Sequence, residues 1–473
     1  MAVGDSNLFF NRDTKVYAVQ ATGTSTYNVW EIPILNGYSF SQSTNSSQIT
    51  LNEMSDATGR SRRGQRSFND SLSPAEWSFD TYARPTAATV VRAPEELLWH
   101  SMFSETNYTA AAGLVAGLPI TSATISGTTL TATFTAAAPT GGTYFEAGDS
   151  ITVSGLSAAT GAAGASGTFV VTACTNATVS YTVPASVSGV VTVTTGKVKS
   201  TTFATTATEL DFFTTSSNKT RLGTFDLYFI LGANKAISDG GTNGTFADSD
   251  ATTIYKLENA CVNETTINFE IDGISTLSWS GMGKTIIEVP AVDFTTGGYT
   301  LITTGVSSTA NMIRNRLTAL TAVGVSPATL AKTYNVTLTG GSITISNNMS
   351  FLTPEVIGIV NQPLEHVTGT RSVSGSFTCY LDEGTNGSID LYQDLLGATT
   401  TVTNKFQLQF FVGGRGNTAG YPASPGVMFD MGQCHLEIPT INIDDVIGFE
   451  VNFTALPQNI SGTDELTKIR YVA

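Results

Sequence analysis

The chain of 473 residues is predicted to be a mainly β protein with two tandem β-sandwich or barrel domains, each carrying one short helix, and a small inserted all-β domain. Three observations predict this fold. Patterns typical of half-buried strands, rich in Val, Ile, Thr, Phe and Tyr with alternating polar residues, recur along the chain. Short motifs of the first part return in the same order in the second part. A long Ser/Thr-rich segment interrupts only the first part.

Ordered repeats indicate that two related domains are joined in tandem. The matching pairs are Thr26–Val29 with Thr333–Val336, Ser78–Tyr82 with Ser376–Tyr380, Leu97–Leu98 with Leu395–Leu396, and Phe225–Gly232 with Phe406–Gly413. Such matches in a fixed order are hard to obtain by chance, so we interpret the chain as a duplication. A duplicated fold can place two similar faces around one axis, which favours a symmetric assembly over an enzyme with a single site.

The spacing of the repeats locates an insertion. The Ser78–Tyr82 and Leu97–Leu98 motifs are 298 residues from their matches, whereas the Phe225–Gly232 motif, after the predicted helix, is 181 residues from its match, which leaves 117 additional residues in the first copy (298 − 181 = 117). The candidate is 105–200, where turn and strand patterns alternate at hairpin spacing and predict a β-sandwich-like module. The predicted domains are therefore 1–104 with 201–292, the inserted 105–200, and 293–473.

Strands are expected wherever alternating patterns run for several residues. In the first copy they are Lys15–Val19, Tyr27–Ile34, Glu76–Tyr82, Phe225–Leu231, Thr265–Ile271 and Ser275–Trp279. In the second copy they are Leu317–Ala322, Tyr334–Leu338, Ser342–Ser346, Gly375–Leu381, Phe406–Val412, Thr440–Ile443 and Gly448–Phe453.

One short helix is expected in each copy. In the first, Pro94 suits the first turn and the acidic residues that follow it complement the positive end of the helix dipole. In the second, Ser388 is a candidate N-cap and Gly397 a candidate stop. The apolar face of the first helix is expected from Leu97, Leu98, Met102 and Phe103, and that of the second from Ile389, Leu391, Tyr392, Leu395 and Leu396.

Composition excludes several classes of protein. The net charge of −15 opposes nucleic-acid binding through phosphate neutralisation. No run approaches the roughly 20 apolar residues of a membrane span, and the start of the chain lacks the pattern of a secretory signal, so we expect no membrane partner and synthesis in the cytoplasm. Four scattered cysteines predict free thiols, with Cys261 and Cys434 at matching places in the two copies.

Catalytic, cofactor and metal sites are not predicted. The three histidines, His100, His366 and His435, stand in no motif with a nucleophile or with metal-ligand spacing. The acidic loop Asp239–Asp250 misses the EF-hand spacing and is expected to be a plain connector. We therefore expect no enzymatic activity, no cofactor and no metal.

Each copy contains a long polar connection, Asn45–Asn69 and Asn347–Thr370, of a length that is often functional or disordered. The first concentrates four basic residues, Arg60, Arg62, Arg63 and Arg66, in an acidic chain. This cluster is open to three interpretations: a nucleic-acid patch, a solvated loop, or an arm whose arginines meet carboxylates of the next molecule. We favour the arm, because complementary charge fixes the register between subunits.

Four segments carry a resemblance to a known family: Gly64–Tyr82, Leu277–Gly281, Met312–Thr318 and Ile345–Val356. In this order they resemble the major tail tube proteins of T-five-like siphophages, which have long non-contractile tails. The resemblance covers both copies. It implies a mainly β fold with two tail-tube-type domains in one chain and a structural rather than catalytic role.

The family resemblance also implies an assembly. Three chains would form a pseudo-hexameric ring, and stacked rings would form a hollow tail tube in the virion, assembled in the host cytoplasm. Implied partners are other copies of the chain, the tape-measure protein and phage DNA that pass through the lumen, and tail tip and terminator proteins. Inter-ring contacts are expected from Arg60, Arg62, Arg63, Arg66, Phe351, Leu352, Pro354 and Glu355.

The balance of charge leads to one further expectation and leaves one alternative. A tube through which DNA slides should have an acidic or neutral inner wall, because arginines would trap the phosphates. The alternative function is that of a β-rich surface adhesion or carbohydrate-binding protein, which the Ser/Thr/Gly-rich segment by itself would allow.

Overall fold

A computed structural model describes most of the chain. The described residues are 8–49, 66–87, 91–103, 118–134, 145, 150–175, 177–200, 209–213, 221–238, 241–248, 252–302, 312–327, 330–353, 357, 362–397, 404–416, 424–443, 446–457 and 465–472. The predicted mainly β fold is confirmed, because strands dominate these residues. No helix among them is long and apolar enough to cross a membrane.

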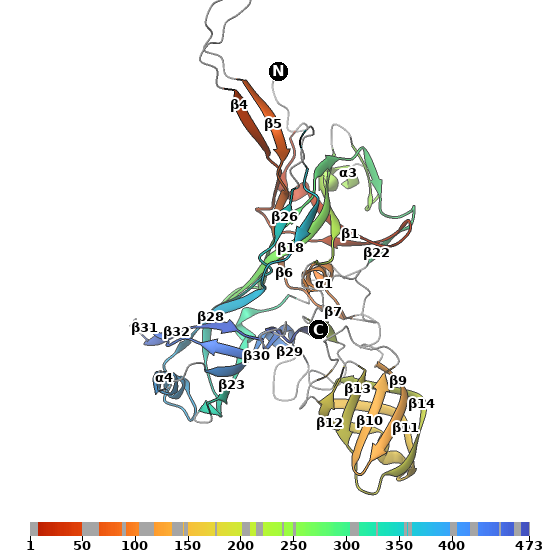
Figure 1. Ribbon diagram of the computed structural model, residues 1–473, viewed down its shortest axis with the longest axis vertical. Helices are drawn as coiled ribbons and strands as arrows, with labels where there is room; N and C mark the ends of the chain where they lie inside the picture. The colour runs from red at the N-terminus through yellow and green to blue at the C-terminus, as the bar shows by residue number, and fades with distance from the viewer. Residues whose placement is uncertain are drawn as a thin grey trace, which may run out of the picture.

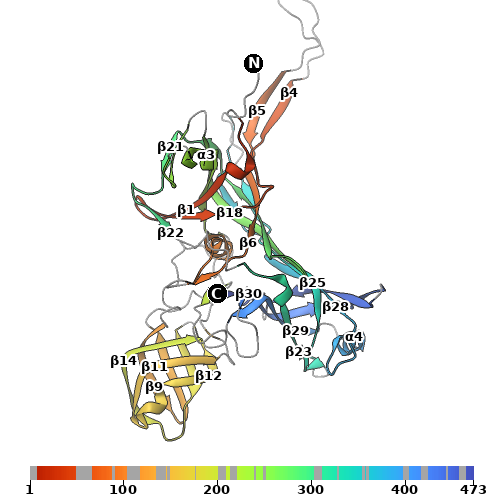
Figure 2. The ribbon, with the colours of Figure 1, turned by 180° about the vertical axis from the view of Figure 1, so that it is seen from behind.

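A ladder of eight antiparallel strands runs through the body of the molecule (Figures 1 and 2). In spatial order its strands are β3 (Ser39–Ser41), β6 (Ala75–Tyr82), β19 (Thr276–Gly283), β18 (Thr253–Glu270), β25 (Leu338–Ser346), β28 (Ser372–Tyr380), β32 (Gly448–Ala455) and β31 (Thr440–Asn442). The first four strands come from the first part of the chain and the last four from the second. Strands β18 and β25 join the two parts, and we call this junction the β18–β25 seam.

A second layer packs over each half of the ladder. The first part contributes β1 (Lys15–Gly23), β2 (Thr26–Ile32), β16 (Phe225–Leu231), the N-terminal half of β18, β20 (Ile286–Glu288) and β22 (Tyr299–Ile302). The second contributes β23 (Ala319–Ser326), β24 (Thr333–Tyr334), β29 (Lys405–Gly416), β30 (Ser424–Leu436) and β33 (Lys468–Val472). Strand β15 (Glu209–Phe213), from the first part of the chain, pairs with β33. One continuous apolar core, which includes all four tryptophans, fills the space between the layers of both parts.

Short strand pairs and turns complete the large unit. The pairs are β4 (Thr44–Ile49) with β5 (Arg66–Leu72), β7 (Thr86–Ala87) with β8 (Val91–Arg92), β17 (Thr245–Ala247) with β21 (Ala291–Asp293), and β26 (Ser350–Leu352) with β27 (Glu365–Val367). Its 3₁₀ turns are η2 (Asn11–Asp13) and η4 (Asn315–Leu317). The β4–β5 hairpin projects from one end of the molecule (Figure 1).

A closed six-stranded barrel lies at the other end, apart from the large unit (Figures 1 and 2). Its strands are β9 (Leu118–Ser126), β10 (Thr129–Phe134), β11 (Ser150–Thr160), β12 (Gly167–Cys174), β13 (Thr178–Thr182) and β14 (Ser188–Ser200), with the 3₁₀ turn η3 (Ala162–Ala165) after β11. The barrel has its own apolar core. It falls within the segment where a sandwich-like module was expected, and it is a barrel because β9 pairs with both β10 and β14 and so closes the sheet.

The two predicted helices are present as α1 (Glu96–Phe103) and α4 (Ser388–Gly397). Ser388 is the first residue of α4, and its hydroxyl donates to the carbonyl of Tyr380 and accepts from the N–H of Asp382. A third helix, α3 (Ala233–Ser238), was not predicted and follows β16 in the first part. The expectation of one helix in each copy is therefore wrong for the first part.

The strand registers correct two alignments made from sequence. Ala18 faces Leu227 and Trp30, whereas Ala322 faces Leu408 and Tyr334. Because Leu227 and Leu408 belong to the same repeated motif, Tyr334 occupies the place of Trp30. The identical tetrapeptides Thr26–Val29 and Thr333–Val336 are thus three residues out of step.

All four cysteines are free thiols, as predicted, but Cys261 and Cys434 do not occupy corresponding positions. Cys434 faces Phe406, while it is Ala260 that faces Phe225. Cys434 therefore corresponds to Ala260, one residue before Cys261.

Candidate functional site

One face of the eight-stranded ladder packs on the core and the other is polar. Along β6, for example, Trp77 and Phe79 point into the core and Ser78 and Asp80 point away from it, as a half-buried strand requires. The polar face carries Glu76, Ser78, Asp80, Tyr82, Glu264, Thr266, Asn268, Glu270, Thr276, Ser278, Ser280, Met282, Ser342, Thr344, Ser374, Ser376, Thr378, Tyr380, Glu450, Asn452 and Thr454. We call this surface the polar face.

Charge on the polar face has one sign. Five of the positions just given are carboxylates and none is Lys or Arg. Hydroxyl pairs bridge neighbouring strands: Ser39 Oγ lies 2.8 Å from Ser78 Oγ, and Thr266 Oγ1 lies 3.0 Å from Thr344 Oγ1 across the β18–β25 seam. A polyanion would meet carboxylates and neutral hydroxyls here, and no side-chain cation at these positions.

Both ends of the ladder are open within the described part of the chain. Strand β3 pairs with β6 and β31 pairs with β32, and neither has a second ladder partner there. Unpaired strand edges present backbone N–H and C=O groups that can pair with another chain. The two ends of the ladder are therefore candidate assembly edges.

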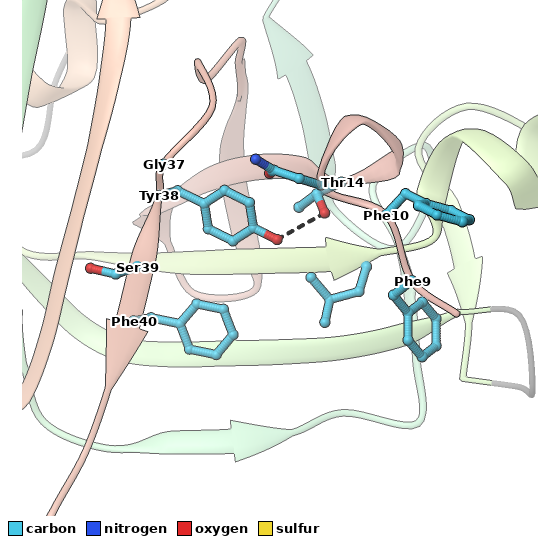
Figure 3. Close-up of a pocket in the computed structure, with 9 residues that line it drawn as sticks. Phe9, Phe10, Thr14, Gly37, Tyr38, Ser39 and Phe40 are labelled. Atoms are coloured by element: carbon cyan, nitrogen blue, oxygen red, sulfur yellow. Dashed lines mark hydrogen bonds between the residues drawn. The ribbon is translucent and has the colours of Figure 1, made fainter. Parts of the chain in front are cut away.

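Apolar side chains are exposed beside both edges. Near β31 they are Ile438, Ile441, Ile443, Val446 and Ile447. Beside β3 lies an open depression of about 440 Å³ whose apolar lining comes mainly from Phe9, Phe10, Tyr38 and Phe40, which we call the aromatic depression. Figure 3 shows these four rings around the same hollow, with Tyr38 Oη 2.9 Å from Thr14 Oγ1. Exposed apolar clusters of this kind mark protein interaction sites.

The two parts of the chain also meet through helix α1, which is buried between them. Trp99 Nε1 donates to Tyr471 Oη at 2.6 Å, and Tyr471 Oη donates to Glu95 Oε1 at 2.8 Å. Burial raises the pKa of Glu95 to about 7, against the opposing effect of the Tyr471 hydrogen bond. This contact joins β33 of the second part to α1 of the first part.

Each half anchors its helix to a strand by a matching hydrogen bond. Trp30 Nε1 donates to Glu96 Oε1 at 2.8 Å, and Tyr334 Oη donates to Asp394 Oδ2 at 2.9 Å. A cation accompanies each carboxylate, at 2.9 Å for Arg92 and 2.7 Å for Lys332. These pairs could not be predicted from the repeats because the strand residues differ in type, although Glu96 and Asp394 are 298 residues apart (394 − 96 = 298), the offset of the Ser78–Tyr82 and Leu97–Leu98 motifs.

Both long connections begin as β-hairpins. Arg66 is the first residue of β5, while Arg60, Arg62 and Arg63 lie outside the described residues. The second hairpin, β26–β27, folds onto the first part of the chain: the N–H of Leu222 donates to His366 Nε2 at 2.9 Å, and Arg221 pairs with Glu365 at 3.0 Å.

The predicted contact residues of the second long connection differ in their exposure to solvent. Phe351 is half-buried against the cluster of Leu222, Cys261 and Met349, whereas Leu352 is exposed. Both belong to β26, which pairs with β27. Pro354 and Glu355 lie outside the described residues.

The histidines have structural surroundings. His366 Nε2 accepts a backbone hydrogen bond, and burial lowers the pKa of the imidazole, which favours its neutral form. His100 lies on α1 and His435 on β30. Among the described residues no three His, Cys, Asp or Glu side chains are grouped so that they could hold a metal ion.

Comparison with known proteins agrees with the resemblance seen in the sequence. The chain is 26% identical over 461 residues to the tail tube protein pb6 of Escherichia phage T5, covering 96% of this chain and 74% of that protein. The chain is a relative of a T5-like tail tube protein. No protein-family model matches the chain. The predicted recognition is thus confirmed, and the similarity extends over nearly the whole of this chain.

Proposed function

We propose that the chain is the structural subunit of a phage tail tube and that three chains close into a pseudo-hexameric ring. The observation that carries the proposal is the ladder, to which each part of the chain contributes four strands in the same order. The similarity to a phage tail tube protein supports it. Three chains of eight strands would form a closed barrel of 24 strands (3 × 8 = 24), and closure would pair both open edges.

The duplication is part of this proposal. Matching pairings in the two halves, and the matching anchors Trp30–Glu96 and Tyr334–Asp394, support descent from one ancestral domain. The domains are 1–104 with 201–292, the inserted 105–200, and 293–473. A covalent pair of such domains replaces one of every two ring contacts by the β18–β25 seam.

The polar face would line the lumen. Duplex DNA carries one negative charge per about 1.7 Å of its axis, so a wall of carboxylates and hydroxyls binds it weakly and lets it slide. The tape-measure protein would occupy the same lumen before DNA is ejected. Rings would stack in the virion tail after assembly in the host cytoplasm, and tail tip and terminator proteins would close the two ends.

The β-hairpin connections would contact the next ring. The β4–β5 hairpin projects away from the ladder and would place Arg60, Arg62, Arg63 and Arg66 near a neighbouring acidic subunit. In the second connection, Leu352 would contribute an exposed apolar contact, beside Phe351, Pro354 and Glu355.

Electron microscopy of the purified chain at rising concentration tests the proposal. We expect hollow tubes or rings whose averaged views have threefold symmetry and an open centre. Rings built from another number of chains, or fibres without a channel, would contradict it.

The lumen is tested by a charge change at Ser376, in the middle of the polar face. Tubes of the Ser376→Lys variant should retain short duplex DNA, because each ring would add three cations to the wall. Tubes of the neutral control Ser376→Gln should release it as the parent tubes do. Equal release from all three kinds of tube would show that the polar face does not line the channel.

A further inference from the structure

We infer that β31 of one chain pairs, antiparallel, with β3 of a second copy, in the register that the β18–β25 seam defines within one chain. The inference rests on the proposed function, because it requires identical chains that meet edge to edge. It adds the facing residues, the side chain that fills the aromatic depression, and the reason why the two kinds of junction differ.

The β18–β25 seam supplies the template. Across it Thr266 faces Thr344, Ile267 faces Ile343, and Asn268 faces Ser342. Polar residues face polar residues on the polar face, and the two isoleucines face each other on the core side, where both are buried.

Strand β3 holds in the first half the place that β25 holds in the second. Ser39 faces Ser78 on β6, and Ser342 faces Ser376 on β28. Ser78 and Ser376 begin the same repeated Ser-Phe motif, 298 residues apart. Ser39 therefore corresponds to Ser342, and the two following residues of β3 correspond to the two following residues of β25.

Strand β31 likewise holds the place of the C-terminal half of β18. Thr266–Asn268 faces Thr276–Ser278 of β19, and Thr440–Asn442 faces Gly448–Glu450 of β32. Strands β19 and β32 are themselves in the same register on β6 and β28. Both segments read Thr-Ile-Asn.

Transferring the register of the seam to the open edges gives three facing pairs. They are Thr440 with Ser41, Ile441 with Phe40, and Asn442 with Ser39. Hydroxyl or amide groups meet on the polar face and apolar groups meet on the core side, as at the seam. A slip by one residue would turn every side chain of β31 to the wrong face, so this register is strongly specified.

The next position explains the aromatic depression. At the seam Phe269 faces Gly341, and a Cβ added to that glycine would lie 2.8 Å from the phenyl ring. The ring lies 5.7 Å from that of Phe410. The seam thus combines a large residue on β18 with no side chain on β25.

At the open edges the larger and the smaller side chain are on the opposite strands from those at the seam. Tyr38 stands where Gly341 stands, and its ring stacks 5.9 Å from that of Phe229, the counterpart of Phe410 in the repeated motif. The residue that faces it in the transferred register is Ile443, which is smaller than Phe269 and 81% exposed in the single chain. The second chain therefore inserts Ile443 beside Tyr38, into the aromatic depression (Figure 3).

Disulfide trapping tests the register. Cysteines are placed singly at Ser39, Ser41, Thr440 and Asn442 in a Cys174→Ser background, since the other three native cysteines are buried. Chains are mixed in pairs, oxidised and separated without reductant. Facing residues bring Cβ atoms to about 4.5–5.5 Å and diagonal ones to about 7–8 Å, so Ser41→Cys with Thr440→Cys, and Ser39→Cys with Asn442→Cys, should cross-link at least about tenfold faster than the two exchanged pairings.

The insertion of Ile443 into the aromatic depression is tested in the same cross-linking assay. Ile443→Glu should slow cross-linking of the facing pairs at least about tenfold, because it would bury a charge against aromatic rings, while Ile443→Leu should preserve it. Since the side chain is exposed in the single chain, both variants should fold.

The results of these experiments distinguish a wrong register from a wrong proposed function. The chains could form threefold rings while the exchanged pairings cross-link as fast as the facing ones, or while Ile443→Glu has no effect. Either result would overturn the register but not the proposed function as a tube subunit. Chains that neither assemble nor cross-link in any pairing would overturn both.

Discussion

The β18–β25 seam and the open edge at β31 differ, although the strands of the two halves of the ladder pair in the same order. At the β18–β25 seam an uninterrupted strand of 18 residues, β18, crosses from the outer layer into the ladder and pairs on both sides. At the open edge the corresponding path is divided into β30 and the three-residue β31, with Pro439 between them. A proline and a short strand limit unwanted pairing at a sheet edge. The covered edge is thus a continuous strand paired on both sides, and the open edge is a short strand that follows a proline.

The two helices show the same difference. Helix α1 is buried on nearly all sides between the two parts, whereas only Ser388, Leu391 and Leu395 of α4 are buried. Leu98 is buried, while Leu396, its counterpart in the repeated motif, is exposed. The second part of the chain therefore covers α1, whereas the corresponding surface of α4 is left exposed.

The largest expected effect comes from truncating the two corresponding edge residues. Phe269→Ala should lower the free energy of unfolding by about 3–5 kcal/mol, because the phenyl ring is buried in the seam. Ile443→Ala should change it by no more than about 0.5 kcal/mol in the unassembled chain. Guanidinium denaturation followed by tryptophan fluorescence measures both, since all four tryptophans lie in the core of the large unit. Equal losses would refute the difference between the edges.

The buried end of α1 should give a pH dependence that α4 lacks. The pKa of Glu95 is raised from 4.5 to about 7 in the folded chain, so folding binds a proton more tightly and stability falls as pH rises from about 4.5 to 7. The contribution of this one group to that fall is roughly 3 kcal/mol.

Glu95→Gln should remove that contribution. The difference in unfolding free energy between the variant and the parent chain should therefore change over this pH interval and become constant above it. Gln393 occupies the corresponding position on exposed α4, and Gln393→Glu is the matched control, for which no such change is expected. Parallel pH curves for Glu95→Gln and the parent chain would show that Glu95 does not carry the effect.

The helix anchors should differ by a smaller amount. Trp30→Phe removes the donor to a fully buried carboxylate and should cost about 2–3 kcal/mol of unfolding free energy. Tyr334→Phe removes the donor to Asp394, whose side chain is partly exposed, and should cost about 0.5–1.5 kcal/mol. The same denaturation measurement applies, and a larger loss for Tyr334→Phe would reverse the ranking of the two anchors.

The smallest effect is expected from the hydroxyl pair at the seam. Thr344→Val removes the partner of Thr266 and should cost about 0.5–1 kcal/mol. Ser41→Val, at the corresponding open position, should leave the unassembled chain within about 0.5 kcal/mol of its parent. If Ser41→Val were the more destabilising of the two in unassembled chains, the correspondence of the two positions would be wrong.

Sequence determined the class of the fold and much of its order. Alternating residues predicted strands of the ladder other than β3, since a strand with one buried face must repeat its apolar residues with a period of two. An apolar segment that follows Pro94 and two acidic residues predicted α1, and an apolar segment between Ser388 and Gly397 predicted α4. The change of motif offset placed additional chain between α1 and β16, where the barrel lies. The residues quoted for the resemblance led to the tail tube relative.

Only the tertiary structure decided registers and edges. The three-residue displacement at Tyr334 and the correspondence of Cys434 with Ala260 follow from strand pairing, which residue type alone does not reveal. Whether an edge is covered depends on a partner far along the chain: β18 and β31 both contain Thr-Ile-Asn, yet β18 meets β25 and β31 meets no second ladder strand in the described chain. Residue types decide which face of a strand is apolar, and three-dimensional contact alone decides what lies beside it.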